Sequence, residues 1–229
     1  MAHSFRNLTT ALLAFSCWLV LAAAERVANV EFNVFALHPI EGLTYTPAAR
    51  QGKKELQFFA TSRSENYSYR GKPRLEFFDR DDPSKQPVAV WEIPEEMKRA
   101  TLIFSPKERN EDKVTKYSII AVDDSMTRIP AGHFAVLNLS STEYVGIQGK
   151  EKMKVAPGLN PAVVGKRKVY IGFALPGAEK NLLSGYQFEN APNQRVLLII
   201  FPPAKKTSLQ PVVRRLVEDG VAKAETETP

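Results

Sequence analysis

The sequence predicts an all-β fold, an antiparallel sandwich or barrel, that follows a cleavable export signal. Three observations support this prediction. The first 24 residues have the composition of a signal peptide, apolar and polar residues alternate over much of the remaining chain, and turns rich in glycine and proline separate the alternating segments. Helical periodicity is sparse, so strands are expected to build the core.

The signal is predicted over residues 1–24, with cleavage after Ala24. Arg6 gives the first region a positive charge, and the uncharged, apolar run over residues 11–24 ends in three alanines, which suit the pocket of a signal peptidase. This run of about 14 residues is shorter than the ~20 that span a bilayer, so a cleaved signal is favoured over an anchor helix. Cys17 lies inside the run rather than at its end, which disfavours a lipidated cysteine.

The chain after residue 24 contains no cysteine, because Cys17 is the only one in the sequence. Disulfides, thiolate metal ligands and a cysteine nucleophile are therefore excluded from the processed protein, whose 205 residues are enough to bury a core. No transmembrane segment is expected there. The longest apolar run, residues 196–201, is typical of a buried strand.

Period-two alternation and short apolar runs predict the strands. The expected strands lie at residues 30–34, 56–59, 74–78, 88–93, 100–104, 113–122, 133–139, 144–148, 169–175, 185–188 and 196–201. Turn chemistry separates several of them, as at residues 70–73, 81–83, 156–158 and 175–177. Residues 94–99 fit one short helical turn, with acids first and bases last.

The predicted domain organisation is one β-sandwich over residues 25–204. The charged segment 106–112 has no strand pattern and could divide two subdomains, but it is short, so one compact unit is favoured. Residues 205–229 are expected to supply a closing strand or a short helix, and then an acidic, disordered tail. No internal repeat is evident in the sequence.

The processed chain carries 30 basic and 25 acidic residues, a net charge of +5. Basic residues are spread along the chain with acids between them. This balance suits contact with anionic surfaces such as lipid head groups, cell-wall polymers or acidic glycans. A solvated surface that keeps the protein soluble is the simpler explanation. A nucleic acid is not expected as a partner.

Two segments carry a resemblance to a known group of proteins. One contains Asp123 and Asp124, then residues 129–132 (Ile-Pro-Ala-Gly) and 136–140 (Val-Leu-Asn-Leu-Ser), and the other is the apolar stretch 195–203. In these segments the chain resembles bacterial secreted β-sandwich proteins of uncharacterised function. The resemblance implies an immunoglobulin-like sandwich in the bacterial cell envelope, and it brings no catalytic residues with it.

Metal and catalytic sites find little support in the sequence. The processed chain has only two histidines, His38 and His133, without ligand-like spacing, and both are better explained as strand-end residues. The acids at residues 79–82 lack the full calcium-loop pattern, and capping of the turn before Pro83 is favoured. No Gly-x-Ser-x-Gly elbow and no phosphate-binding glycine loop is present. No metal, cofactor or catalytic residue is therefore expected.

Tyr67 and Tyr69 form the one ligand-binding hypothesis that the sequence offers. They lie on the same side of an extended segment, and Arg70 follows them, so the two rings could stack on a sugar or peptide. Ordinary cross-strand packing of the two rings on a sandwich face is the competing and favoured explanation.

The leading functional hypothesis is a non-enzymatic, secreted or periplasmic protein with a structural or protein-interaction role in the cell envelope. Its partner would be an envelope protein or an anionic or glycan surface. A carbohydrate or cell-wall binding module is the first alternative. An envelope hydrolase, which would need clustered carboxylates in a cleft, is the second.

Overall fold

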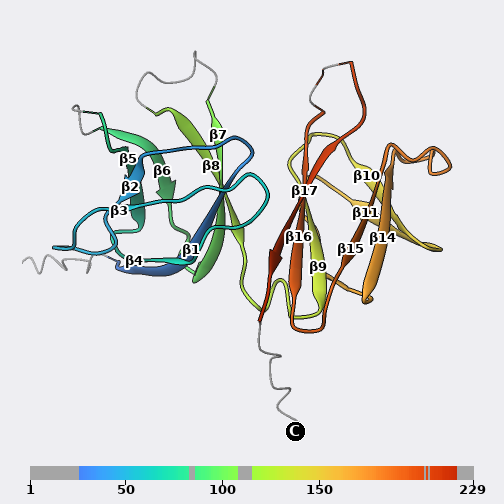
Figure 1. The fold of residues 1–229 in the computed structure, drawn as a ribbon, viewed down its shortest axis with the longest axis horizontal. Coiled ribbons are helices and arrows are strands. Elements are labelled where there is room, and N and C mark those ends of the chain that lie inside the picture. Colours follow the sequence, from blue (N-terminus) through green and yellow to red (C-terminus); the bar gives the residue numbers. More distant parts are fainter. Residues whose placement is uncertain (1–25, 83–85, 108–114, 204, 206, 221–229) are drawn as a thin grey trace, which may run out of the picture.

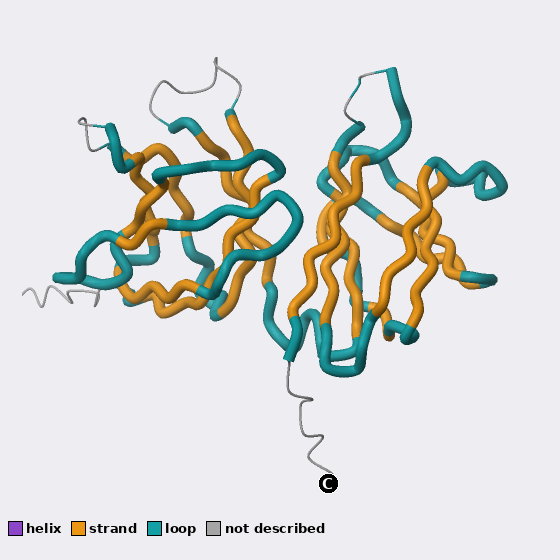
Figure 2. Tube along the Cα trace, viewed as in Figure 1, coloured by secondary structure: helices purple, strands orange, loops and turns teal. Residues whose placement is uncertain are grey.

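The computed structural model describes residues 26–82, 86–107, 115–203, 205 and 207–220. The predicted signal at residues 1–24, with its cleavage site after Ala24, and the tail from residue 221 lie outside this part. Every regular element within the described residues is a strand, and no helix occurs among them (Figure 2). The predicted all-β, sandwich-like fold is therefore confirmed at this level.

Strands β1 to β8 form a first sandwich of two four-stranded sheets, on the left in Figure 1. The strands are β1 (Ala28–Ala36), β2 (Leu43–Tyr45), β3 (Lys54–Glu55), β4 (Tyr67–Gly71), β5 (Arg74–Asp79), β6 (Pro87–Glu92), β7 (Arg99–Pro106) and β8 (Tyr117–Asp123). Sheet A has the order β4-β1-β7-β8, and sheet B has the order β3-β2-β5-β6. The pairs are antiparallel except for β1 and β7, which run parallel.

Strands β9 to β17 form a second sandwich beside the first (Figure 1). The strands are β9 (His133–Asn138), β10 (Tyr144–Gln148), β11 (Glu151–Val155), β12 (Gly158–Leu159), β13 (Val163–Val164), β14 (Lys168–Ala174), β15 (Ser184–Glu189), β16 (Arg195–Phe201) and β17 (Val212–Glu218). Sheet C has the order β12-β9-β16-β17, with β13 also paired to β9, and sheet D has the order β11-β10-β14-β15.

The two sandwiches repeat one topology. In sheets A and C, the first strand of the sandwich pairs parallel with the last but one, β1 with β7 and β9 with β16. The last strand then closes the sheet, β8 against β7 and β17 against β16. The order of sheet D matches that of sheet B strand for strand. A structural repeat is thus present that the sequence alone did not reveal.

Each sandwich encloses its own core. The first core is rich in aromatic rings, with Phe32 at 5.2 Å from Tyr45, 5.6 Å from Tyr67 and 6.3 Å from Phe77, measured between ring centroids. The second core is more aliphatic and is built mainly from β14 and β16 together with Phe134. The alternating segments of the sequence therefore bury one side of each strand, as the period of two predicts.

A third apolar cluster lies between the sandwiches and joins sheet A to sheet C. Its buried members come from matching strands: Phe35, Ile103 and Val122 on β1, β7 and β8, and Leu137, Ile199 and Leu216 on β9, β16 and β17. Each of these positions has its structural equivalent on the opposite side of the contact. The two sandwiches therefore meet through the same face of the repeated fold, and Figure 1 shows these sheets side by side.

Charged side chains close one end of this contact. The Arg195 side chain is fully buried; its Nη1 donates to the carbonyl of Asp124 at 2.6 Å and its Nε donates to Glu218 at 2.9 Å. Arg99 donates to the same Glu218 at 2.5 Å, and Arg63 pairs with the Asp124 carboxylate. Burial lowers the pKa of Arg195 below its usual value, and the attraction of the two facing acids, Asp124 and Glu218, offsets only part of this shift. These five residues, called the interface charge cluster below, tie each sandwich to the other.

Several elements predicted from the sequence can be compared with the elements that the structure describes. Residues 94–98 form a turn and residues 212–218 form a strand, so neither helical alternative occurs there. Residues 56–59 are not a strand, and β3 ends just before them. Most of segment 106–112 lies outside the described residues, and the strands that flank it, β7 and β8, pair with each other.

Candidate functional site

Tyr67 and Tyr69 lie on β4 with their rings inside the first core. They are 1% and 8% exposed, so neither ring is open to a ligand. The Tyr67 hydroxyl accepts a hydrogen bond from Gln57 N at 2.9 Å, and the Tyr69 hydroxyl donates to the carbonyl of Lys72 at 2.9 Å. Burial raises the pKa of both phenols. Arg70, which follows Tyr69, is exposed on the other side of the strand, so no stacking platform forms here.

The other candidates from the sequence also have structural partners. Asp79 accepts from Lys116 Nζ at 2.7 Å and from Asp81 N at 3.1 Å, contacts that lower its pKa and cap the turn. His38 follows β1 and His133 begins β9. Among the described residues, no group of three or more His, Asp or Glu side chains could hold a metal ion.

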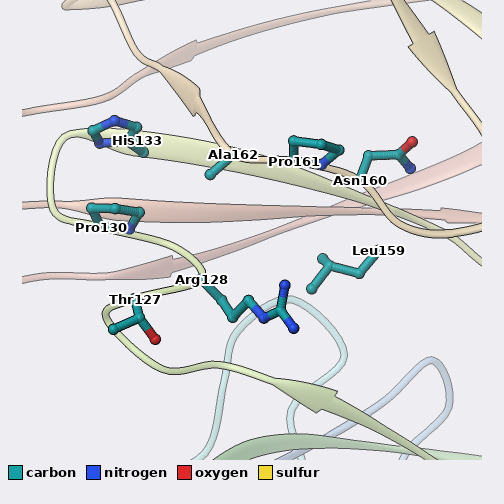
Figure 3. A pocket seen from close by; sticks show the side chains of 8 residues that line it. All are labelled: Thr127, Arg128, Pro130, His133, Leu159, Asn160, Pro161 and Ala162. Atoms are coloured by element: carbon teal, nitrogen blue, oxygen red, sulfur yellow. The ribbon is translucent and has the colours of Figure 1, made fainter.

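A hollow lies beside His133 at one end of the second sandwich (Figure 3). Some of its polar groups bond within the protein: Asn160 Nδ2 donates to three backbone carbonyls, and Arg128 Nε donates to Asp123 at 3.3 Å, although the Arg128 side chain is 68% exposed. His133 Nδ1 lies 3.0 Å from the carbonyl of Ala131. In Figure 3 the Arg128 side chain extends toward Leu159, away from the imidazole. These contacts thus hold the loops of this hollow in place, and Arg128 does not converge with His133.

A second hollow lies on the outer face of sheet D, across β10, β14 and β15. It has a volume of about 430 Å³. Tyr170 and Leu182 are each 56% exposed, although large apolar side chains are usually buried. The residues that line it are Ile147, Gly149, Tyr170, Ile171, Gly172, Leu182, Gly185, Tyr186 and Gln187. This set, called the sheet D hollow below, contains no carboxylate and no imidazole.

Two glycines form the floor of the sheet D hollow. Gly172 and Gly185 are direct partners across β14 and β15. The methyl groups of Leu182 pack on Gly172, because a Cβ there would lie 2.9 Å from both of them. A Cβ on Gly185 would meet no atom within 4 Å. Gly185 therefore opens directly into the hollow.

The polar groups of the sheet D hollow come from Tyr170 and Gln187, which face each other across β14 and β15. Within the described part of the chain, no hydrogen bond engages the Tyr170 hydroxyl or the Gln187 amide. The hollow thus combines an exposed aromatic ring, a flat floor and two polar groups that are available to hydrogen-bond a ligand.

The repeat supplies an internal reference for this site. The ladder between β5 and β6 in sheet B begins like the ladder between β14 and β15 in sheet D. In sheet B, Arg74 pairs with Glu92, and Ile93 N donates to Pro73 O. In sheet D, Lys168 pairs with Glu189, and Asn190 N donates to Arg167 O. Counting from these anchors, the outward positions of Glu76 and Phe78 in β5 match those of Tyr170 and Gly172 in β14.

The matching positions differ in the side chains that they present to solvent. In sheet B, Glu76 accepts from Arg74 Nε at 3.1 Å, and the half-buried Phe78 ring lies under Lys53 Nζ at 4.8 Å. In sheet D, Tyr170 stands at the position of the ion-paired glutamate, and Gly172 stands at the position of the phenylalanine. Both faces are hollowed, but the sheet B hollow, of about 320 Å³, is lined by charged side chains such as Arg74 and Glu76, whereas no charged side chain lines the sheet D hollow.

Sequence reasoning did not select Tyr170. The alternation from Lys168 to Phe173 does place Tyr170 and Gly172 on the outward side of a strand, and an exposed tyrosine two residues before an in-strand glycine was the available signal. No sequence pattern predicts that Leu182 and Gly185 lie beside Tyr170, because only the folded sheet brings these residues together.

Comparison with protein-family models and with curated proteins finds no match to this sequence. Across the described residues, no helix is both long and apolar enough to cross a membrane. The site must therefore be interpreted from its own geometry.

Proposed function

We propose that the protein is exported and serves in the cell envelope as a non-catalytic binding module, an immunoglobulin-like pair of sandwiches that docks through the outer face of sheet D. The sheet D hollow carries this proposal, because Tyr170 and Leu182 are exposed around a glycine floor. Exposed apolar side chains that gather in a hollow are typical of interaction sites. Its lining, without carboxylate or imidazole, suits holding a ligand rather than converting it.

Export is proposed from the composition of residues 1–24. To test it, the full chain is produced in an export-competent bacterium, and the product is fractionated and sequenced from its N-terminus. The expected result is an extracytoplasmic protein that begins at Glu25. A cytoplasmic product that keeps residues 1–24 would overturn this part of the proposal.

The docking face is tested by co-sedimentation of the processed protein with isolated cell envelopes. Tyr170→Ser combined with Leu182→Ser is expected to lower the bound fraction at least tenfold, because both exposed apolar surfaces are lost. The matched control is Glu76→Ser, at the position equivalent to Tyr170 in the first sandwich, which should bind as the parent does. Equal binding by the double variant and the parent contradicts the proposed face.

A further inference from the structure

Charge is distributed unevenly between the two sandwiches. Residues 26–124 contain sixteen basic and sixteen acidic residues, so the first sandwich is neutral. Residues 125–220 contain thirteen basic and six acidic residues, a net charge of +7. The positive excess of the protein therefore belongs to the sandwich that carries the sheet D hollow.

Some basic residues of the second sandwich lie next to residues that line this hollow. Lys152 is the cross-strand partner of Ile147, Lys150 follows Gly149, and Lys168 precedes Tyr170 by two residues on the same side of β14. Segments 149–152, 166–168 and 179–189 adjoin the lining residues in the sequence and, without Arg167, which lines a different hollow, hold five basic and three acidic residues. Lys152 lies 3.8 Å from Glu179, and Lys168 faces Glu189, so part of this charge is neutralised and a net charge of +2 remains.

We infer that the sheet D hollow binds an anionic glycan, a polymer whose sugar rings carry carboxylate or sulfate groups. This inference rests on the proposed docking face. The apolar side of a pyranose ring can stack on Tyr170 over the glycine floor, as aromatic side chains commonly allow. Gln187 and the Tyr170 hydroxyl hydrogen-bond the ring hydroxyls, and the surrounding lysines pair with the acidic groups.

The apolar hollow and the positive charge beside it are both needed to specify the ligand. A protein partner without charge would leave the net charge of +2 beside the hollow unused, and a simple polyanion would leave the Tyr170 ring and the 430 Å³ hollow unused. An acidic polysaccharide matches the two together, because it alternates apolar ring faces with negative charge. Charge complementarity also raises the rate of encounter with such a polymer.

The test measures binding of three probes by calorimetry: oligogalacturonate, the neutral maltohexaose and polyglutamate. Oligogalacturonate is expected to bind at least tenfold more tightly than either of the others. Raising the salt from ~0.1 M to ~1 M, which shortens the screening length from about 10 Å to about 3 Å, should weaken this binding. Equal affinity for polyglutamate would reduce the interaction to polyelectrolyte attraction and overturn the inference.

Two variants locate the binding without unfolding the protein. Gly185→Val fills the hollow, since a Cβ there meets nothing within 4 Å and a β-branched residue suits a strand. It should abolish oligogalacturonate binding while leaving the melting temperature unchanged or raised. Lys168→Gln should weaken binding several-fold, whereas Lys98→Gln, an exposed lysine of the neutral sandwich, should not. Unchanged binding by Gly185→Val would overturn the inference.

Failure of this inference is separable from failure of the proposed function. If no glycan probe binds but the Tyr170→Ser, Leu182→Ser variant still loses envelope binding, the docking face stands and the ligand class is wrong. A protein ligand would then be indicated by envelope binding that protease treatment of the envelopes removes. If neither assay responds to the variants, both proposals are overturned.

Discussion

The two sandwiches share one topology and differ in what their outer sheets present. Sheet B is covered by the Arg74, Glu76 and Glu92 ion pairs and by the Phe78 ring, whereas sheet D exposes Tyr170 over a glycine floor. Their inner sheets, A and C, meet through equivalent positions. The repeated fold thus keeps one face for internal contact, and the opposite faces of the two copies differ in whether charged or apolar side chains line their hollows.

The largest effect is expected at the interface charge cluster. Asp124→Ala removes one of the two carboxylates that face the buried Arg63 and Arg195 and leaves only Glu218 opposite them, which should lower the free energy of unfolding by about 3–5 kcal/mol. Arg99→Met, at the position equivalent to Arg195 but more exposed, should cost less than half as much. Urea denaturation measures both. Equal costs would contradict the smaller contribution expected of the more exposed Arg99.

Glycine substitutions provide the next contrast. A Cβ on Gly165 would lie 1.7 Å from Asn190 Nδ2, and the buried Asn190 side chain cannot move without losing its hydrogen bond to Gly132. Gly165→Ala should therefore destabilise the protein by about 1–3 kcal/mol. Gly185→Ala, with open space around it, should stabilise by up to about 1 kcal/mol. Thermal unfolding distinguishes the two, and a destabilised Gly185→Ala would contradict the open floor.

Alkaline pH should affect the first sandwich before the second. Burial raises the pKa of Tyr45 to about 12, while an unfolded tyrosine ionises near 10. Between about pH 10 and 12 the folded state holds a proton that the unfolded state releases, so stability that is complete below pH 10 falls as the pH rises. Tyr45→Phe should make the unfolding free energy less dependent on pH in this window. Denaturant titrations at several pH values test this, and identical slopes for parent and variant would contradict it.

The smallest effect is expected on the outer face of sheet B. The side chains of Arg74 and Glu76 are 51% and 39% exposed, so their ion pair is screened by solvent. Glu76→Ala should change the free energy of unfolding by no more than about 0.5 kcal/mol. A larger loss in urea denaturation would mean that the ion pairs hold sheet B together rather than merely cover it.

The strand content followed from the sequence because alternation is a local property, visible within residues 28–36 or 168–174. The division into two sandwiches did not follow from the sequence. It depends on the parallel pairing of β1 with β7, which are some 70 residues apart, and no local pattern encodes that contact. Tyr67 and Tyr69 could not be told from surface residues, because alternation gives the shared side of two rings but not which side is covered. The sheet D hollow depends on Leu182 and Gly185 meeting Tyr170, which is again a tertiary property.

The interface charge cluster also sets an order of assembly. Its arginines at positions 63 and 99 belong to the first sandwich, while Glu218 ends β17, the last strand. During synthesis, more than a hundred residues of further chain follow these arginines before that carboxylate is added. The charge cluster is therefore complete only when β17 has paired with β16 in sheet C, because Glu218 faces the arginines at positions 63, 99 and 195.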